Sequence, residues 1–223
     1  PTSDIWPTRT LKNCGSSSIK YQVLDIETTT NKLLAKGIVE RIGLPMGDLV
    51  HKPVGKDKLA LSQPIPDHTT GIRLVLDALT NGEHGVIASL EEVKAVGHRV
   101  AHGGEYFADS CVVTEDVKAK IKELFAIAPL HNPANLEGIL SIEKVLPAVP
   151  QVAVFDTSFH QTIPAMNYLY ALPMEYYEKY RVRRYGFHGT SHKFVAKRGA
   201  EFCGLDIANS KIITCHVGNG GSV

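Results

Sequence analysis

Apolar residues recur at regular intervals along the chain, and their spacing predicts strands in several segments. In Ser18–Ile26, every second residue from Ile19 to Val23 is apolar, which is the period of a strand with one buried face. Gln151–Asp156 and Lys211–Gly218 are short apolar runs, as expected of strands that are buried on both faces.

Apolar positions three and four residues apart predict helices with one buried stripe. Thr114 is a candidate N-cap, and Glu115 and Asp116 suit the positive end of the helix dipole. Asn132 is the expected cap of another helix, with Pro133 at its first position. The predicted helices are Gly71–Thr80, Thr114–Phe125, Asn132–Leu146 and Thr190–Gly204, the last closed by its glycine, while Ser89 and Glu92 form a capping-box pattern.

Strands that alternate with helices indicate an α/β fold. A domain boundary is expected just after the strand that ends at Asp156, because a polar segment containing proline follows it. We therefore predict an N-terminal α/β domain over residues 1–157 and the beginning of a second domain over 158–223.

Two segments give a weaker pattern. Residues 43–70 are rich in proline, glycine and charge, and are expected to be irregular or to form short strands. Pro7, Arg9 and Lys12 argue against a central strand immediately before Asn13.

The composition is that of an ordinary globular chain and argues against several classes of protein. The formal net charge is +1, so no strong field favours nucleic acid or a membrane surface. No apolar stretch is long enough to span a membrane, and the N-terminus lacks a signal-peptide pattern, so we expect a cytoplasmic protein.

The basic run Arg181–Arg184 is expected to be a solvated edge. The cysteines fit neither C-x-x-C nor a zinc pattern and are expected to be reduced thiols: Cys14, Cys111, Cys203 and Cys215.

Two glycine-rich loops lie beside apolar strand patterns, "NCGSSSIK" (Asn13–Lys20) and "HVGNGG" (His216–Gly221). Backbone amides in such turns can bind anionic oxygen, Lys20 adds positive charge, and Asn13 offers an oxygen to a metal or its water. Taken alone, the first loop favours an ordinary serine-rich hairpin turn, and the second is weak evidence because any hairpin can use Asn-Gly. Together they favour a site that binds the phosphates of one nucleotide.

Further polar residues lie where predicted strands end. Arg99 presents a donor fork suited to a carboxylate or phosphate, although it could instead be a buried ion-pair partner. Asp156 follows an apolar run, where ligand sites of α/β sheets lie, although it could also cap a turn. His188 lies in a loop before a helix and could donate to developing negative charge. Structural roles are expected for His98, His102 and His192.

These segments, in this order, resemble the acetate kinase family (acetate and propionate kinases). The resemblance implies an actin-like, ribonuclease-H-like α/β fold shared with sugar kinases and Hsp70. The match would cover about the N-terminal half of a full-length member, which implies a truncated second domain. The matching stretches are "NCGSSSIK", "GHRVAHGGE", "APLHNPANLEGI", "VAVFDTSFHQT", "YLYALP", "RRYGFHGTSH" and "CHVGNGGSV", which together span Asn13 to Val223.

The resemblance also implies roles for individual residues, with ATP or ADP, Mg²⁺ and a short-chain carboxylate or its acyl phosphate as ligands, and a homodimer. Asp156, His188 and Arg99 would be catalytic, and Asn13 would help to bind the metal. Arg99, His131, Ala101, Leu130 and Phe187 would bind the substrate. Ser16, Ser18, Lys20, His216, Val217, Gly218, Asn219 and Gly220 would bind the nucleotide.

The implied reaction is phosphoryl transfer from ATP to acetate, which gives acetyl phosphate and ADP. An ionised carboxylate has no proton to lose, so we interpret Asp156 as an organiser of the site rather than as a general base. Ala101 stands where acetate kinases commonly carry valine, which leaves propionate as an alternative substrate. A sugar kinase fits less well, because sugars need carboxylates rather than an arginine. The sequence also leaves open a non-catalytic binding protein and a catalytically incomplete, inactive fragment.

Overall fold

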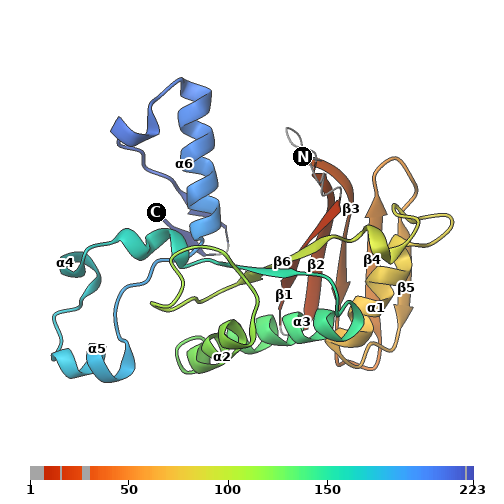
Figure 1. Cartoon of the computed structure of the whole chain (residues 1–223), viewed down its shortest axis with the longest axis horizontal. Coiled ribbons are helices and arrows are strands. Elements are labelled where there is room, and N and C mark those ends of the chain that lie inside the picture. The colour runs from red at the N-terminus through yellow and green to blue at the C-terminus, as the bar shows by residue number, and fades with distance from the viewer. Residues whose placement is uncertain (1–7, 16, 27–30, 219) are drawn as a thin grey trace, which may run out of the picture. The chain divides into compact units, whose positions relative to one another are not determined.

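The computed structural model describes residues 8–15, 17–26, 31–218 and 220–223, and the chain divides into two compact units (Figure 1). The first unit comprises Pro1–Val100 and Cys111–Ala153, and the second comprises Ala101–Ser110 and Val154–Val223. Helices and strands are mixed in the described chain, in agreement with the predicted α/β class.

A mixed sheet dominates the first unit, with its strands in the order β5-β4-β3-β2-β1-β6-β8-β7. From β1 to β5, each strand pairs antiparallel with the next strand in the sequence, whereas β1 pairs parallel with β6. The strands are β1 (Thr8–Cys14), β2 (Ser18–Ile26), β3 (Asn31–Glu40), β4 (Gly47–Pro53), β5 (Leu59–Gln63), β6 (Ala95–Val100), β7 (Cys111–Val112) and β8 (Gln151–Phe155).

One face of this sheet packs against helices and forms the core. Ile19 and Val23 of β2 are fully buried, and they belong to the same hydrophobic cluster as Ile72 and Leu79 of α1 and Ile142 of α3. The alternation that predicted β2 therefore marks the face that the helices cover. The helical segments of this unit are α1 (His68–Leu79), η1 (Leu90–Glu92), α2 (Glu115–Glu123), η2 (Leu124–Ala126) and α3 (Asn132–Val145).

A buried hydrogen-bond chain crosses the core face of three strands. The hydroxyl of Tyr21 donates to Nδ1 of His51 at 2.7 Å, and Nε2 of His51 donates to the carbonyl of His84 at 3.2 Å. Burial raises the pKa of Tyr21 and lowers that of His51, so both groups stay neutral. A Cβ at Gly37 would lie 2.5 Å from the Tyr21 ring, so the ring can pack over residue 37 only because that residue is glycine.

The strand β1 overturns one expectation from the sequence. Despite Arg9 and Lys12, residues 8–14 form a strand between β2 and β6, paired with β2 from Thr8 to Cys14. Main-chain pairing on both sides accounts for the strand, and Pro7 lies outside the described residues.

Several local predictions are confirmed. Residues 43–70 contain the short strands β4 and β5. Ser89 forms the predicted capping box, although the turn that it caps is only the 3₁₀ segment η1. Thr114 accepts a hydrogen bond from the amide of Val117 and caps α2. Cys111, Cys203 and Cys215 are free thiols.

Two details of the helices differ from the prediction. α1 begins at His68, three residues before the predicted start, because the side chain of Asp67 accepts from the amide of Thr70 and caps it. The cap of α3 is His131 rather than Asn132. Asn132 is already helical and fully buried, so its side chain does not lie at an exposed helix end.

The second unit consists of short helical segments around one longer helix. Gly204, with φ of 64°, closes α6 as predicted. The predicted strand over 211–218 is wrong except at its end, since among the described residues only β10 pairs with this segment, at His216 and Val217. The elements are η3 (Ser158–Thr162), α4 (Ala165–Tyr168), α5 (Met174–Tyr180), α6 (Gly189–Cys203), η4 (Ile207–Asn209), β9 (His216–Val217) and β10 (Gly221–Ser222).

Within the described residues, the helices are all too short or too polar to cross a membrane.

Candidate active site

Asp156 and His188 are held next to each other by the main chain of the second unit. Asp156 follows the last residue of β8 and is 3% exposed. The amide of Gly189 donates to the carbonyl oxygen of Asp156 at 2.8 Å, and a Cβ at Gly189 would lie 2.3 Å from that oxygen. The start of α6 can therefore approach the end of β8 only because residue 189 is glycine.

His188 adopts a backbone conformation that is uncommon for a residue with a side chain. Its φ is 56° and its ψ is 25°, in the left-handed region, at the N-cap of α6. Such conformations cost about 1–3 kcal/mol and persist where the surrounding structure enforces them, often at functional sites. Here the Gly189–Asp156 hydrogen bond fixes the turn, and the imidazole is positioned by backbone strain rather than by rotamer choice alone.

The ring of His188 belongs to a cluster of imidazoles and hydroxyls. It stacks on the ring of His216 with a centroid distance of 4.2 Å and an interplanar angle of 23°. Nδ1 of His188 lies 2.7 Å from the hydroxyl oxygen of Ser222, and Nε2 of His192 lies 2.8 Å from the same oxygen. Nδ1 of His216 lies 2.9 Å from the hydroxyl oxygen of Ser191.

The shared hydroxyl constrains the protons of this cluster. Ser222 has one hydroxyl proton, so it can donate to only one of its two imidazole partners, and the other must donate to it. Burial, together with the charges of the neighbouring histidines, lowers the pKa of His192, which favours its neutral form. Ser222 bonds to Nδ1 of His188, which leaves Nε2 as the ring atom that can reach a ligand.

Sequence reasoning treated His192 as a structural residue and did not identify Ser222. His192 is indeed 4% exposed and bonded on both ring nitrogens, to Ser222 and to Thr214. The available signal was its spacing of four residues from His188, which brings two side chains to one side of a helix start.

Two of the residues predicted to bind the acyl group, Ala101 and Phe187, lie in the second unit. Ala101 is 2% exposed, and the ring of Phe187 meets the ring of His102 edge-on at 5.5 Å. His102 is structural, as predicted, since its Nδ1 accepts from the amide of Gly104 at 2.9 Å. Burial, with a smaller contribution from the charge of Arg183, lowers the pKa of His102 to about 4.

The basic run Arg181–Arg184 is only partly the solvated edge that the sequence predicted. The Arg183 side chain is 4% exposed, its Nη1 donates to Glu105 at 2.7 Å, and its guanidinium lies 3.6 Å from the centroid of the Tyr168 ring. Glu105 also accepts from Tyr177 and Arg181. Burial opposes ionisation of Glu105, but these hydrogen bonds and charges outweigh it and lower its pKa.

Other predicted site residues lie together in the first unit, at the ends of the interior strands β1, β2 and β6. Asn13 of β1 is the register partner of Lys20 of β2, and Lys12 is the partner of His98, which immediately precedes Arg99. The amide of Gly15 donates to the carbonyl of Ser18 at 2.8 Å, which closes the tight turn that the sequence predicted. The Lys20 side chain is exposed.

The remaining predicted residues are less closely grouped. His131 is exposed at the N-cap of α3, and Leu130 before it is 79% exposed. Val217 and Gly220 are exposed in and after β9, and the amide of Gly218 donates to the carbonyl of Gly220 at 2.8 Å, which forms a tight turn. Ser16 and Asn219 lie outside the described residues.

Among the described side chains, no group of three or more histidine, cysteine or acidic residues could hold a metal ion by itself. Mg²⁺ typically binds through one or two carboxylates and keeps its remaining positions for water and substrate phosphates. The buried carboxyl of Asp156 at a strand end is the kind of ligand that such a site uses.

Residues 10–223 match the model of the Acetokinase family. The acetate kinase of Desulfitobacterium hafniense is 56% identical over 211 residues, which cover 95% of this chain and 52% of that relative. The crystal structure of Porphyromonas gingivalis acetate kinase superposes with a TM-score of 0.90 at 47% identity, over 96% of this chain and 53% of that one. A propionate kinase from Francisella tularensis superposes with a TM-score of 0.87 at 38% identity, over the same shares of the two chains. The chain thus spans about half the length of the relatives that it matches.

Proposed function

Since this chain belongs to the acetokinase family, we propose that it serves reversible phosphoryl transfer from ATP to acetate, which gives acetyl phosphate and ADP. The observation that carries the proposal is the strained placement of His188, beside Asp156 and stacked on His216. The relatives named acetate kinase support acetate as the substrate.

The chemistry requires positioning and neutralisation of charge more than a base. A carboxylate oxygen forms a bond to the γ-phosphorus while the bond between that phosphorus and the bridging oxygen of ADP breaks. Both reactants are anions, and the attacking carboxylate has no proton to remove. Imidazole and guanidinium donors that are already aimed at the transferring group lower the barrier, because they need little reorganisation in the transition state.

We assign His188 to the developing charge on the phosphoryl group, through the Nε2 that Ser222 leaves available. Asp156 organises the site, and Arg99 holds the carboxylate and the phosphoryl group, with His131 contacting the same group. Ala101, Leu130 and Phe187 line the pocket for the acyl tail. Ser16, Ser18 and Lys20 line the first phosphate loop, and His216, Val217, Gly218, Asn219 and Gly220 form the second.

Mg²⁺ would enter with the nucleotide and would be held by Asp156 and Asn13, directly or through water. When bound, it would neutralise charge on the phosphates. We further propose that the protein is a cytoplasmic homodimer with a domain boundary after residue 157.

A chimera tests the activity. This chain would replace the matching part of the D. hafniense acetate kinase, to which it is 56% identical. ATP-dependent formation of acetyl hydroxamate is expected, and Asp156→Asn and His188→Ala should each lower kcat by about 10²–10³-fold. Lys122→Gln, on the exposed surface of α2, is the control and should change nothing. An active chimera that tolerates both site variants would contradict the assignment.

The same assay on the chain by itself tests the expectation that it is inactive alone.

Propionate is the second candidate substrate, favoured by the buried Ala101. Valine at this position would add two methyl groups to the proposed acyl pocket, and one methylene changes discrimination by about 1–3 kcal/mol. In the chimera, Ala101→Val should raise the ratio of kcat/KM for acetate to that for propionate by about tenfold or more. An unchanged ratio would remove Ala101 from the acyl pocket.

A further inference from the structure

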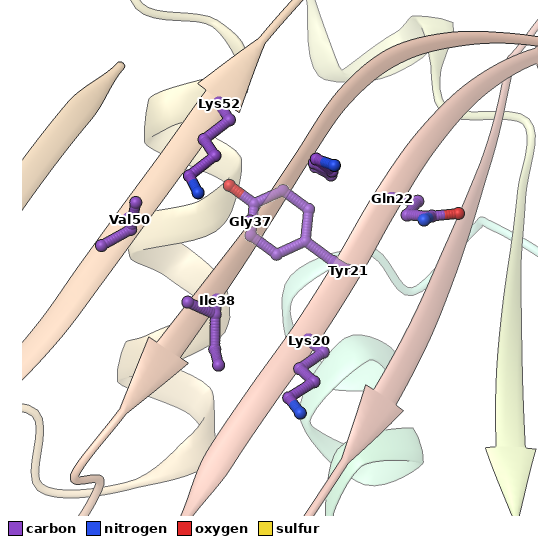
Figure 2. Close-up of a pocket in the computed structure, with 8 residues that line it drawn as sticks. Lys20, Tyr21, Gln22, Gly37, Ile38, Val50 and Lys52 are labelled. Carbon is purple, nitrogen blue, oxygen red and sulfur yellow. The ribbon is translucent and has the colours of Figure 1, made fainter. Parts of the chain in front are cut away.

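A groove with a volume of 390 Å³ opens on the face of the first unit's sheet opposite the core (Figure 2). In β2, β3 and β4 the core face carries the odd-numbered residues Tyr21, Gly37 and His51, which are register partners. The even-numbered residues therefore point to the other face. There, Lys20 and Gln22 pair with Ile38 and Lys36, and these pair with Val50 and Lys52.

The cations of this groove are arranged unfavourably for the protein alone. Lys36 and Lys52 are direct cross-strand partners, and like charges in that relation repel each other. Lys20, Lys36 and Lys52 have no hydrogen bond or ion pair with any described residue, and all three are exposed. An anion bound between them would relieve the repulsion.

Acidic residues on the same face do not supply that anion. Glu40 and Asp48 are partners of each other, one pair further along β3 and β4, beyond Ile38 and Val50. Asp48 is already paired with Arg41, at 3.4 Å. Among the described residues, neither Glu40 nor Asp48 forms an ion pair with a lysine of the groove.

The centre of the groove is apolar. Ile38 and Val50 lie side by side on β3 and β4 and are half-buried, and Tyr21 and Gly37 complete the lining. Figure 2 shows Lys20 beside Ile38 on the adjacent strand, and Lys52 further along the strand that carries Val50. Small-molecule pockets commonly combine an apolar surface of this kind with a few charged groups, in volumes from about 300 Å³ upward.

We propose that this groove binds a small organic dianion whose body is flat and apolar. The apolar part would lie over Ile38 and Val50, and the two anionic ends would reach Lys20 on one side and Lys36 with Lys52 on the other. Lys20 also belongs to the proposed first phosphate loop, whereas Lys36 and Lys52 belong to neither loop. The double variant of Lys36 and Lys52 therefore tests this groove separately from the proposed kinase activity.

Naphthalene-2,6-dicarboxylate is a suitable probe. Its binding to the full chain would be measured by calorimetry, and the location by ¹H–¹⁵N shifts of backbone amides. The comparison ligands are 2-naphthoate, with one charge, and sulfate, with no apolar body. We expect the dianion to bind more tightly than either, to weaken as salt is added, and to shift the amides of Ile38 and Val50 most.

Lys36→Gln combined with Lys52→Gln should weaken binding of the dianion by about five- to tenfold, because each exposed charge pair contributes modestly. Lys122→Gln combined with Lys197→Gln removes the same charge from two exposed helix positions and should have no effect. The proposal is overturned by absent binding, by sulfate binding as tightly as the dianion, by shifts centred elsewhere, or by equal losses in the two double variants.

Discussion

Arg181 and Arg183 allow a direct comparison of an exposed and a buried ion pair, because both bond to the carboxylate of Glu105. Nη1 of Arg183 lies 2.7 Å from one oxygen and Nη1 of Arg181 lies 3.2 Å from the other. The Arg183 side chain is 4% exposed, whereas that of Arg181 is 54% exposed. Replacing each by glutamine therefore compares a buried and an exposed interaction with one partner.

The expected losses in stability follow from that exposure. Removing one member of a buried pair costs about 3–5 kcal/mol, but the Glu105 side chain is 26% exposed and keeps Tyr177 and Arg181. We therefore expect Arg183→Gln to cost about 2–3 kcal/mol, including the lost contact with the Tyr168 ring at 3.6 Å. Arg181→Gln should cost less than about 1 kcal/mol, since solvent screens an exposed pair.

Urea unfolding of the two variants measures the difference. Because the chain has two compact units, hydrogen exchange of peptides from residues 165–187 should accompany the global signal, and it should rise in the Arg183 variant alone. A double-mutant cycle with Glu105→Gln isolates the coupling, which should be larger for Arg183. If Arg183→Gln and Arg181→Gln lower the free energy of unfolding equally, burial does not determine how much each arginine contributes to stability.

Three further predictions follow from local geometry. Gly37→Ala would place a methyl group 2.5 Å from the Tyr21 ring and should cost about 1–3 kcal/mol in urea unfolding, whereas Gly82→Ala, which meets open space, should be nearly neutral. The pKa of His102 is lowered from 6.5 to about 4, so the folded state binds fewer protons, and stability should fall as the pH drops from about 6.5 towards 4. His102→Asn should flatten that part of the pH profile, and an unchanged profile would contradict the assignment. Thr114→Ala removes the N-cap bond of α2 and should cost about 1 kcal/mol, while a loss near zero would mean that solvent replaces the cap.

The sequence predicted local structure best where that structure depends only on residues close by in the chain. The alternation in β2, the cap at Thr114 and the terminal glycine of α6 each depend on the nearest residues, and each is confirmed. The strand β1 was rejected because propensity was weighed without its neighbours, whereas pairing with β2 and β6 determines its conformation. The strand β3 was not predicted at all.

The candidate site was predictable as a set of residue types but not as an arrangement. The motifs identified Asp156, His188 and His216, and the structure adds the Gly189–Asp156 hydrogen bond and the ring stacking that hold them. Ser222 and the buried Arg183 were missed, because a lone serine carries no pattern and an arginine in a basic run resembles a surface residue. Burial of a charge depends on a partner that is distant in sequence, here Glu105.

The second unit is built from two separate stretches of chain, and this limits how the protein can be dissected. A piece that starts at Val154 would lack residues 101–110. Arg183 would then lose the Glu105 carboxylate, and Phe155 would lose the ring of Phe107, which stacks on it at 4.2 Å. One cut in the polypeptide cannot yield both units intact, so expression of the second unit by itself calls for a linker that restores the short stretch.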